Sequence, residues 1–404
     1  MNLRIPSTVG ERYSPLYFLA ALGSGGMTAN FFIWLLFWVP HSGHSMPLFE
    51  DISTAYATGT RLMRLAIGLA MSGIALFALL HLLLMLWNLV EFGRYRHTAA
   101  ARLLRSGNTE TQLLALPLTV AMTINVTFIV GTVFVPGLGS MQETLFPAAM
   151  VSFLLVGIWA LRLLGDFYAR VLTQGGFDCA RNNSFAQMLP AFALAMIGVG
   201  LAAPAMLSVT PWIAGVSYLL SNFFIVTALL LGTVHLVFGM RSMMKIGANI
   251  ESAPTLWITV PILTITTITF LRQGYSAHIH FGDQATAFNE FNLITVALSA
   301  QVAFLLLGWV VLRRHDYFRR FVFSREVSSG SWALICPGVA FGLMLHLFTN
   351  KGLVAVGLID KYNLAYWILS GLALAVQMST IALMLRLAIT HLSAWRADSV
   401  VYEP

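Results

Sequence analysis

Long apolar runs separated by short polar segments dominate the pattern of this chain. A helix needs about 20 predominantly apolar residues to cross the hydrocarbon core of a bilayer, and ten runs approach or exceed that length. The connecting segments are too short for a soluble domain, so residues 1–404 are predicted to form one all-α polytopic membrane domain. The predicted spans are Ser14–Val39, Leu65–Leu89, Leu113–Val135, Leu145–Leu164, Leu189–Leu207, Val216–Met240, Pro254–Phe270, Phe291–Leu312, Ser331–Phe348 and Tyr362–Leu387.

The composition narrows the function classes further. Hydrophobic residues make up 58% of the 404 residues and charged residues only 10%, whereas soluble domains have about 25% charged residues. This balance excludes a soluble enzyme, a disordered chain and a nucleic-acid-binding protein. Two cysteines exclude a disulfide framework and a cysteine-based metal centre. The sequence has no P-loop, G-x-S-x-G or H-E-x-x-H motif, so we predict a non-enzymatic protein without a cofactor or metal.

Basic residues indicate the orientation. If both termini are cytoplasmic, only Arg61, Arg64, Arg272, Lys351 and Lys361 of the 23 lysines and arginines fall in outer segments. Cytoplasmic loops of membrane proteins carry the excess of lysine and arginine, so we expect both termini in the cytoplasm. The expected location is the inner membrane of a bacterium, with the lipid bilayer as the surrounding partner.

Proline and glycine are concentrated in the odd-numbered spans, and proline begins four of these five. Helix breaks in a membrane persist where protein or a water-filled cavity satisfies the backbone, and small residues let helices approach closely. We therefore predict five helical hairpins, in which kinked odd-numbered helices form an inner ring around a pore and even-numbered helices lie outside. At any single glycine, tight helix packing is the alternative explanation.

Threonines supply a neutral polar lining for this predicted pore. Thr119, Thr123 and Thr127 recur at every fourth position and so share one helix face. Membrane threonines also bond back to carbonyls of their own helix, which is the structural alternative. The predicted lining residues, chosen mainly from these threonines and from the helix breaks, are Gly25, Gly26, Thr119, Thr123, Thr127, Thr259, Thr266, Pro261, Cys336 and Pro337.

The charge pattern favours an anionic substrate. No acidic residue lies in the core of an odd-numbered span, and all five of these helices would have their N-termini, with partial positive charge, on the cytoplasmic side. Basic residues lie near the expected mouths of the pore and add to this field: Arg12, Arg241 and Lys245 inside, and Arg61, Arg64 and Arg272 outside. The alternative role of these residues is to anchor the topology.

Short motifs resemble a known family. They are Ser14–Phe18 followed by Gly23–Gly26, Leu116–Thr119, and Trp332 with Pro337. With ten spans and five hairpins, the chain resembles the tellurite-resistance/dicarboxylate transporter family, which includes the plant slow-type anion channels. The resemblance implies a central pore through the inner helices, a small anionic substrate such as an inorganic anion, a sulfite-like oxyanion or a C4-dicarboxylate, and assembly as a homotrimer.

The chain departs from the family pattern at Cys336. The family typically has a phenylalanine directly before the proline of the ninth span, where it plugs the pore. Phe341 lies about 140° around the helix from Cys336 and so does not replace that plug. The gate candidates are therefore Phe18, Trp257, Phe270 and Cys336, while a more open pore or a chemical role for the thiol are alternatives. A small buried hydrophobe is the structural interpretation of Cys336.

Histidines within the spans are the remaining candidates, because ionisable residues in membranes often mark functional sites. His346 is a candidate proton site, whereas His81 and His235, on even-numbered helices, are expected to form interhelical hydrogen bonds. The rival function is a haem- or quinone-binding membrane subunit of a respiratory enzyme, which needs two histidines at similar depth on facing helices. A neutral pore fits both a channel and a proton-coupled carrier.

Overall fold

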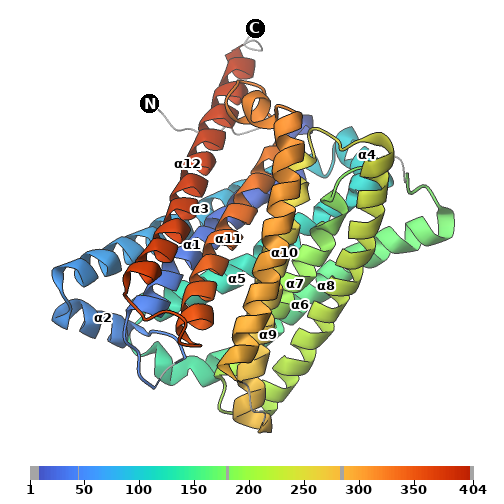
Figure 1. The fold of residues 1–404 in the computed structure, drawn as a ribbon. Helices are drawn as coiled ribbons and strands as arrows, with labels where there is room; N and C mark the ends of the chain where they lie inside the picture. The colour runs from blue at the N-terminus through green and yellow to red at the C-terminus, as the bar shows by residue number, and fades with distance from the viewer. Residues whose placement is uncertain (1–8, 44, 179–181, 283–285, 401–404) are drawn as a thin grey trace.

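Ten long helical segments, each long and apolar enough to cross a membrane, make up most of the bundle in Figure 1. The computed structural model describes residues 9–43, 45–178, 182–282 and 286–400, and this part of the chain contains no strand. The prediction of an all-α polytopic membrane protein is therefore confirmed. Two short helices, α2 (Phe49–Thr58) and α4 (Ala99–Ser106), lie in the connections.

The odd-numbered spans form a closed inner ring. Around the ring, α1 packs against α5, α5 against α7, α7 against α9, α9 against α11, and α11 against α1. In the most apolar 18-residue stretch of each, 56% to 94% of the residues are buried. The helices of the ring are α1 (Phe18–Trp38), α5 (Ala115–Phe134), α7 (Leu189–Leu207), α9 (Thr259–Phe281) and α11 (Ile335–Leu347).

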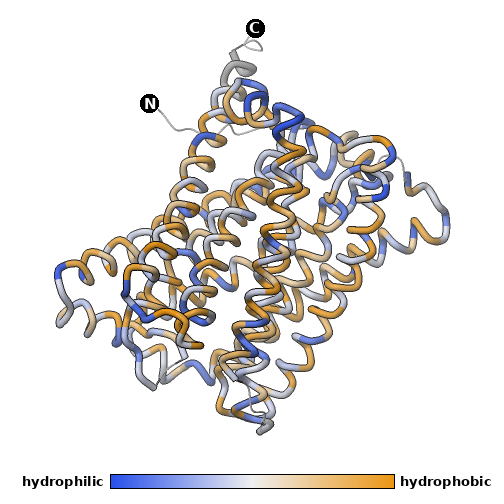
Figure 2. The backbone as a smooth tube through the Cα atoms, viewed as in Figure 1, coloured by the Kyte–Doolittle hydropathy of each residue, from blue (hydrophilic) through white to orange (hydrophobic). Residues whose placement is uncertain are grey.

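The even-numbered spans surround this ring and face lipid. Only 22% to 39% of the residues in their most apolar stretches are buried, and most of their length is coloured as hydrophobic in Figure 2. This difference confirms the predicted inner and outer helices. The outer helices are α3 (Arg61–Tyr95), α6 (Leu138–Gln174), α8 (Pro211–Ile246), α10 (Ala287–Arg314) and α12 (Leu364–Val400).

Every inner helix begins in the same way, with a 3₁₀ turn that passes into an α-helix. The hairpin repeat predicted from prolines therefore extends to the ninth span, although that span begins without a proline. Pro261 and Pro337, predicted as breaks within the spans, lie instead in the first turns of α9 and α11, where a missing N–H interrupts no helical hydrogen bond. The turns are Pro15–Tyr17, Asn108–Leu114, Ala186–Met188, Ala253–Trp257 and Ser329–Leu334.

A polar side chain bridges each of the five junctions of the inner ring. Such contacts fix neighbouring helices in register where the hydrophobic effect between them is weak. The bridges are Asn30 Nδ2 to the Val339 carbonyl (2.8 Å), Thr119 Oγ1 to Phe18 (3.3 Å), Asn125 Nδ2 to Met196 Sδ (3.8 Å), Arg272 Nη1 to Val199 (2.8 Å) and Thr264 Oγ1 to Ala340 (3.1 Å).

Both chain ends lie at one end of the bundle (Figure 1), as an even number of spans requires. We call this the terminal end and the opposite one the far end. The inner helices all start at the terminal end, so their partial positive charges gather there. The basic residues predict that the terminal end is cytoplasmic.

Candidate functional site

A cavity of about 910 Å³ opens at the far end of the bundle and extends between the five inner helices. Its mouth includes His41 and Ser45, in the segment after α1, and Lys361, between α11 and α12. Its deepest residues include Leu22 of α1, Pro261 of α9 and Cys336 of α11. Because Pro261 and Cys336 lie in first turns, the cavity penetrates most of the length of the ring.

A constriction closes this cavity toward the terminal end. A second pocket of about 40 Å³ lies there, lined by residues such as Leu16, Gln112 and Pro337. Phe192, Pro261 and Cys336 line both the cavity and this small pocket, and the side chain of Phe192 is only 3% exposed. We call these three residues the waist. They come from the first turns of α7, α9 and α11 and separate two compartments on one axis.

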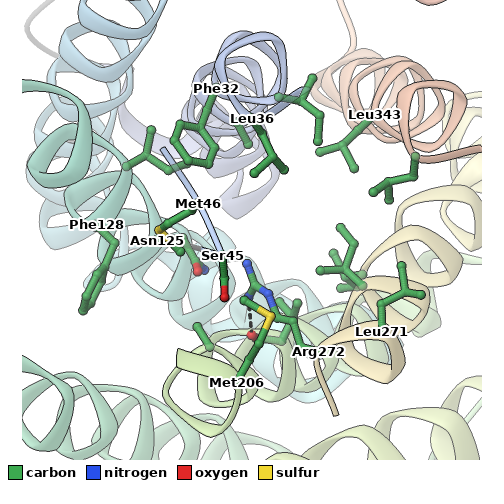
Figure 3. A pocket seen from close by; sticks show the side chains of 18 of the residues that line it. Phe32, Leu36, Ser45, Met46, Asn125, Phe128, Met206, Leu271, Arg272 and Leu343 are labelled. Atoms are coloured by element: carbon green, nitrogen blue, oxygen red, sulfur yellow. Dashed lines mark hydrogen bonds between the residues drawn. The ribbon is translucent and has the colours of Figure 1, made fainter. Parts of the chain in front are cut away.

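The walls of the cavity are mainly apolar. Figure 3 shows Phe32 and Leu36 from α1, Phe128 from α5, Leu271 from α9 and Leu343 from α11 around the open space. Asn125, Ser45 and Arg272 bring polar atoms into the same view. A concave, mostly apolar site with a few converging polar groups is the usual form of a small-molecule site.

Arg272 is the basic side chain inside this apolar cavity. Its Nη1 donates to the Val199 carbonyl on α7 (2.8 Å), the dashed contact in Figure 3. Among the described residues, no carboxylate lies within ion-pair distance of Arg272. The sequence placed Arg272 in an outer segment beyond a span that ended at Phe270. The helix α9 continues to Phe281, so this placement is corrected: Arg272 lies within the span.

Other charges line the cavity near its mouth. Lys351 lies in the π-helix Phe348–Val354, which follows α11, Lys361 in the next connection, and Glu290 in the first turn of α10. With Arg272, the described lining has three permanently basic side chains and one acidic one. The described lining therefore carries more positive than negative charge.

The predicted threonine stripe of α5 does not line the cavity. Thr119 contacts α1, Thr123 Oγ1 lies 2.8 Å from His81 Nε2 of α3, and Thr127 is exposed on the outside of the bundle. Each hydroxyl also donates to the carbonyl four residues earlier. The stripe lies about 155° around the helix from the true lining face, which consists of Met122, Asn125, Phe128, Ile129 and Thr132.

Gly26 lines the cavity, as predicted, but Gly25 does not. A Cβ at Gly25 would lie 2.7 Å from Met122 Cγ and 2.9 Å from His81 Nδ1, so Gly25 permits close packing among α1, α3 and α5. Thr259 and Thr266 are buried and line neither pocket, and their hydroxyl oxygens have no partner in the described part of the chain.

The aromatic gate candidates lie away from the waist. Phe18 is fully buried against Phe92 of α3, with ring centroids 6.2 Å apart, and Trp257 Nε1 donates to the Leu305 carbonyl of α10. Phe270 lines neither pocket. Among these four candidates only Cys336 lies at the waist, and the aromatic ring there belongs to Phe192. Its signal in the sequence is a bulky residue two positions after Pro190, in a helix otherwise rich in alanine and glycine.

His346 is buried behind the cavity wall. It is 1% exposed, its ring meets Trp38 edge-on at 6.3 Å, and its Nε2 has no partner in the described part of the chain. It does not line the cavity. Its role as a proton site therefore stays a prediction.

The histidines of the outer helices form interhelical hydrogen bonds. His81 Nδ1 lies 2.7 Å from the Ala21 carbonyl, so both of its ring nitrogens contact protein. His235 Nε2 lies 2.7 Å from the hydroxyl of Tyr168 on α6. The two histidines pack against different helices and do not face each other. Two haem ligands would have to face each other. The described residues also contain no group of three or more histidines, cysteines or carboxylates that could hold a metal.

No family model, curated protein sequence or solved structure matches this chain. Ten apolar helices around a deep cavity are typical of membrane transport proteins. The chemistry of any substrate must therefore be inferred from the cavity itself.

Proposed function

We propose that this protein is an integral membrane transporter or channel for small anions, which move along the axis of the inner ring. The observation that carries the proposal is Arg272, a basic side chain in an apolar cavity that has no carboxylate partner among the described residues. Candidate substrates are an inorganic anion, a sulfite-like oxyanion or a carboxylate such as a C4-dicarboxylate. The proposal includes membership of the tellurite-resistance/dicarboxylate transporter family, a role without catalysis, and a homotrimer in a bacterial inner membrane.

Electrostatics support an anion rather than a cation. An arginine at the centre of a membrane helix costs about 3 kcal/mol on insertion scales, so an apolar cavity retains such a residue at a substantial cost. A bound anion offsets this cost, because it forms charge-assisted hydrogen bonds with the guanidinium. A cation would meet Arg272, Lys351 and Lys361 with only Glu290 to attract it.

The helix termini extend this preference beyond Arg272. The waist lies near the N-terminal ends of α7, α9 and α11, where the helix dipoles place partial positive charge. An anion leaving the cavity toward the terminal end would therefore move toward partial positive charge. Passage requires Phe192 to move, because its side chain separates the cavity from the small pocket.

Flux into liposomes tests the proposal. Purified protein is reconstituted, and uptake of chloride, nitrate, sulfite and succinate is compared with uptake of rubidium, with and without a pH gradient. We expect anion uptake that exceeds rubidium uptake and falls at least about tenfold in Arg272→Gln, since loss of a charged hydrogen-bond partner costs about 1.5–3 kcal/mol. Glutamine removes the charge and keeps an N–H donor on a shorter side chain.

The sequence placed Arg64 near a mouth of the pore, but in the structure it lines neither pocket. Arg64→Gln is therefore the matched control, because Arg64 is an exposed arginine near the start of α3 whose Nη2 donates to the Ala57 carbonyl. Its uptake should equal that of the wild type. Rubidium uptake equal to anion uptake, or an equal loss in both variants, would contradict the proposal. Stimulation by a pH gradient would identify a proton-coupled carrier.

A further inference from the structure

The cavity is larger and more apolar than a compact inorganic anion requires. Its volume of about 910 Å³ lies near the upper end of the range for sites that bind drug-sized ligands. Phe32, Leu36, Phe128, Leu271 and Leu343 surround the space in Figure 3. Chloride or nitrate would gain nothing from these walls, whereas each buried methylene of an organic ligand strengthens binding about fourfold.

The chemistry of Arg272 narrows the charged group. A guanidinium has five N–H donors in a planar fork, and the Val199 carbonyl is the one hydrogen-bond acceptor that Arg272 contacts in the described part of the chain. The remaining donors match the two oxygens of a carboxylate, which arginine binds in a bidentate manner. A spherical halide has no pair of oxygens to accept two parallel N–H bonds, so it matches the guanidinium less well.

The distribution of charge limits the number of carboxylates. In the five inner α-helices, Arg272 is the residue that carries a permanent charge. Lys351 and Lys361 lie near the mouth, where they share the lining with Glu290. Beside Arg272, Figure 3 shows the apolar side chains of Leu271 and Met206 and the neutral polar ones of Ser45 and Asn125, so a second carboxylate bound there would lose its hydration without a charged partner.

We propose that the cavity is a binding site for a monocarboxylate with an apolar body, such as a medium-chain or aromatic carboxylate. The carboxylate binds Arg272, and the body lies along the walls formed by α1, α5, α9 and α11. This inference rests on the proposed anion pathway and names its substrate class. It would make the protein a carrier of organic acids that prefers substrates with a single negative charge.

Calorimetric binding to the full-length protein in nanodiscs tests this inference. The probes are butyrate, hexanoate, octanoate, benzoate, succinate and sodium chloride, and octyltrimethylammonium reports partition into lipid. We expect affinity to rise about fourfold for each added methylene, and hexanoate to bind at least tenfold more tightly than succinate. Octyltrimethylammonium should bind no more tightly than it does to empty nanodiscs.

Two variants separate the charged group from the walls. Arg272→Gln should weaken hexanoate binding at least tenfold, while Arg64→Gln leaves it unchanged. Leu343→Asn places an amide in the wall and should reduce the gain per methylene, with butyrate binding unchanged. An elution profile on gel filtration that matches the wild type shows that each variant is folded, and Arg272→Lys, which keeps the charge but loses the fork, should give intermediate binding.

The outcomes distinguish this inference from the transport proposal. Tighter binding of chloride or succinate than hexanoate, or a chain-length dependence that survives Arg272→Gln, overturns the monocarboxylate site even if anion flux is observed. Chain-length-dependent binding that requires Arg272, without flux of any anion, supports the site and contradicts transport.

Discussion

The two helices of the third hairpin, α7 and α8, differ in what surrounds them although both are strongly apolar. In their most apolar stretches, 94% of the residues of α7 are buried, compared with 33% in α8. The inner helix is buried on all sides and consists largely of alanine, glycine and leucine. The outer helix presents Leu219, Phe223 and Leu230 to lipid, with exposed fractions of 70%, 53% and 65%.

The polar residues of α8 show why hydropathy alone does not distinguish inner helices from outer ones. Ser217 and Ser221 face α7, and Ser221 Oγ donates to the Gly198 carbonyl at 2.8 Å. Outer helices thus turn their polar stripe inward and their large apolar residues outward, because lipid solvates leucine but cannot satisfy a hydroxyl. The inner helix α7 has almost no surface toward lipid, so its sequence is governed by close approach and by the cavity.

The largest expected difference between the rings concerns Phe192 at the waist. Opening requires its ring to leave a packed site, and full burial of a phenylalanine is worth about 1.5–3 kcal/mol. Phe192→Ala should therefore raise anion flux into liposomes about tenfold to a hundredfold, whereas Phe223→Ala on the lipid face of α8 should not change it. Cys336→Phe adds a ring at the same waist and should lower flux. Equal effects of Phe192→Ala and Phe223→Ala would show that the waist does not limit permeation.

Paired glycine substitutions compare packing in the two rings. Gly25→Ala places a methyl group against Met122 and His81, whereas a Cβ at Gly371 on α12 meets nothing within 4 Å. Overpacking should destabilise the protein by about 1–3 kcal/mol, and alanine at an open helical position should stabilise it by up to about 1 kcal/mol. Thermal unfolding in detergent, followed by tryptophan fluorescence, measures both. Equal melting temperatures would contradict a tightly packed ring.

The smallest effect concerns threonine hydroxyls. Thr264 Oγ1 donates to the Ala340 carbonyl across the ring and lies 2.6 Å from Gln301 Nε2, whereas exposed Thr227 on α8 bonds only within its own helix. Thr264→Val should cost about 0.6–1.7 kcal/mol, as interhelical hydrogen bonds in membranes do, and Thr227→Val should cost almost nothing. Chemical unfolding of both variants measures the difference. A larger loss of unfolding free energy in Thr227→Val than in Thr264→Val would contradict the expectation that threonine contacts stabilise the inner ring more than the outer one.

Much of the architecture could be predicted from local features of the sequence. Apolar runs predicted ten spans because the bilayer imposes a length on every helix, and proline and glycine predicted which spans lie inside. The sequence also located Pro261, Cys336 and Pro337 near the narrow part of the axis. It misplaced Arg272 because α9 extends 11 residues beyond the span expected from hydropathy, which ended at Phe270.

The faces of the inner helices were beyond local reasoning. The stripe of Thr119, Thr123 and Thr127 pointed to a face that contacts α1, α3 and the outside of the bundle. The sequence could not exclude this face, because α5 also has polar residues, Asn125 and Thr132, on the side that meets the cavity. The sequence by itself determined the helices, their number and their sorting into two rings. The length of each apolar run, the positions of proline and glycine, and the compatibility of large apolar side chains with lipid are all local properties of the sequence. Only the tertiary structure decided that Phe192 lies between the two pockets and that Arg272 faces the cavity without a carboxylate partner in the described part of the chain, because rotation and depth arise from contacts between helices far apart in the chain.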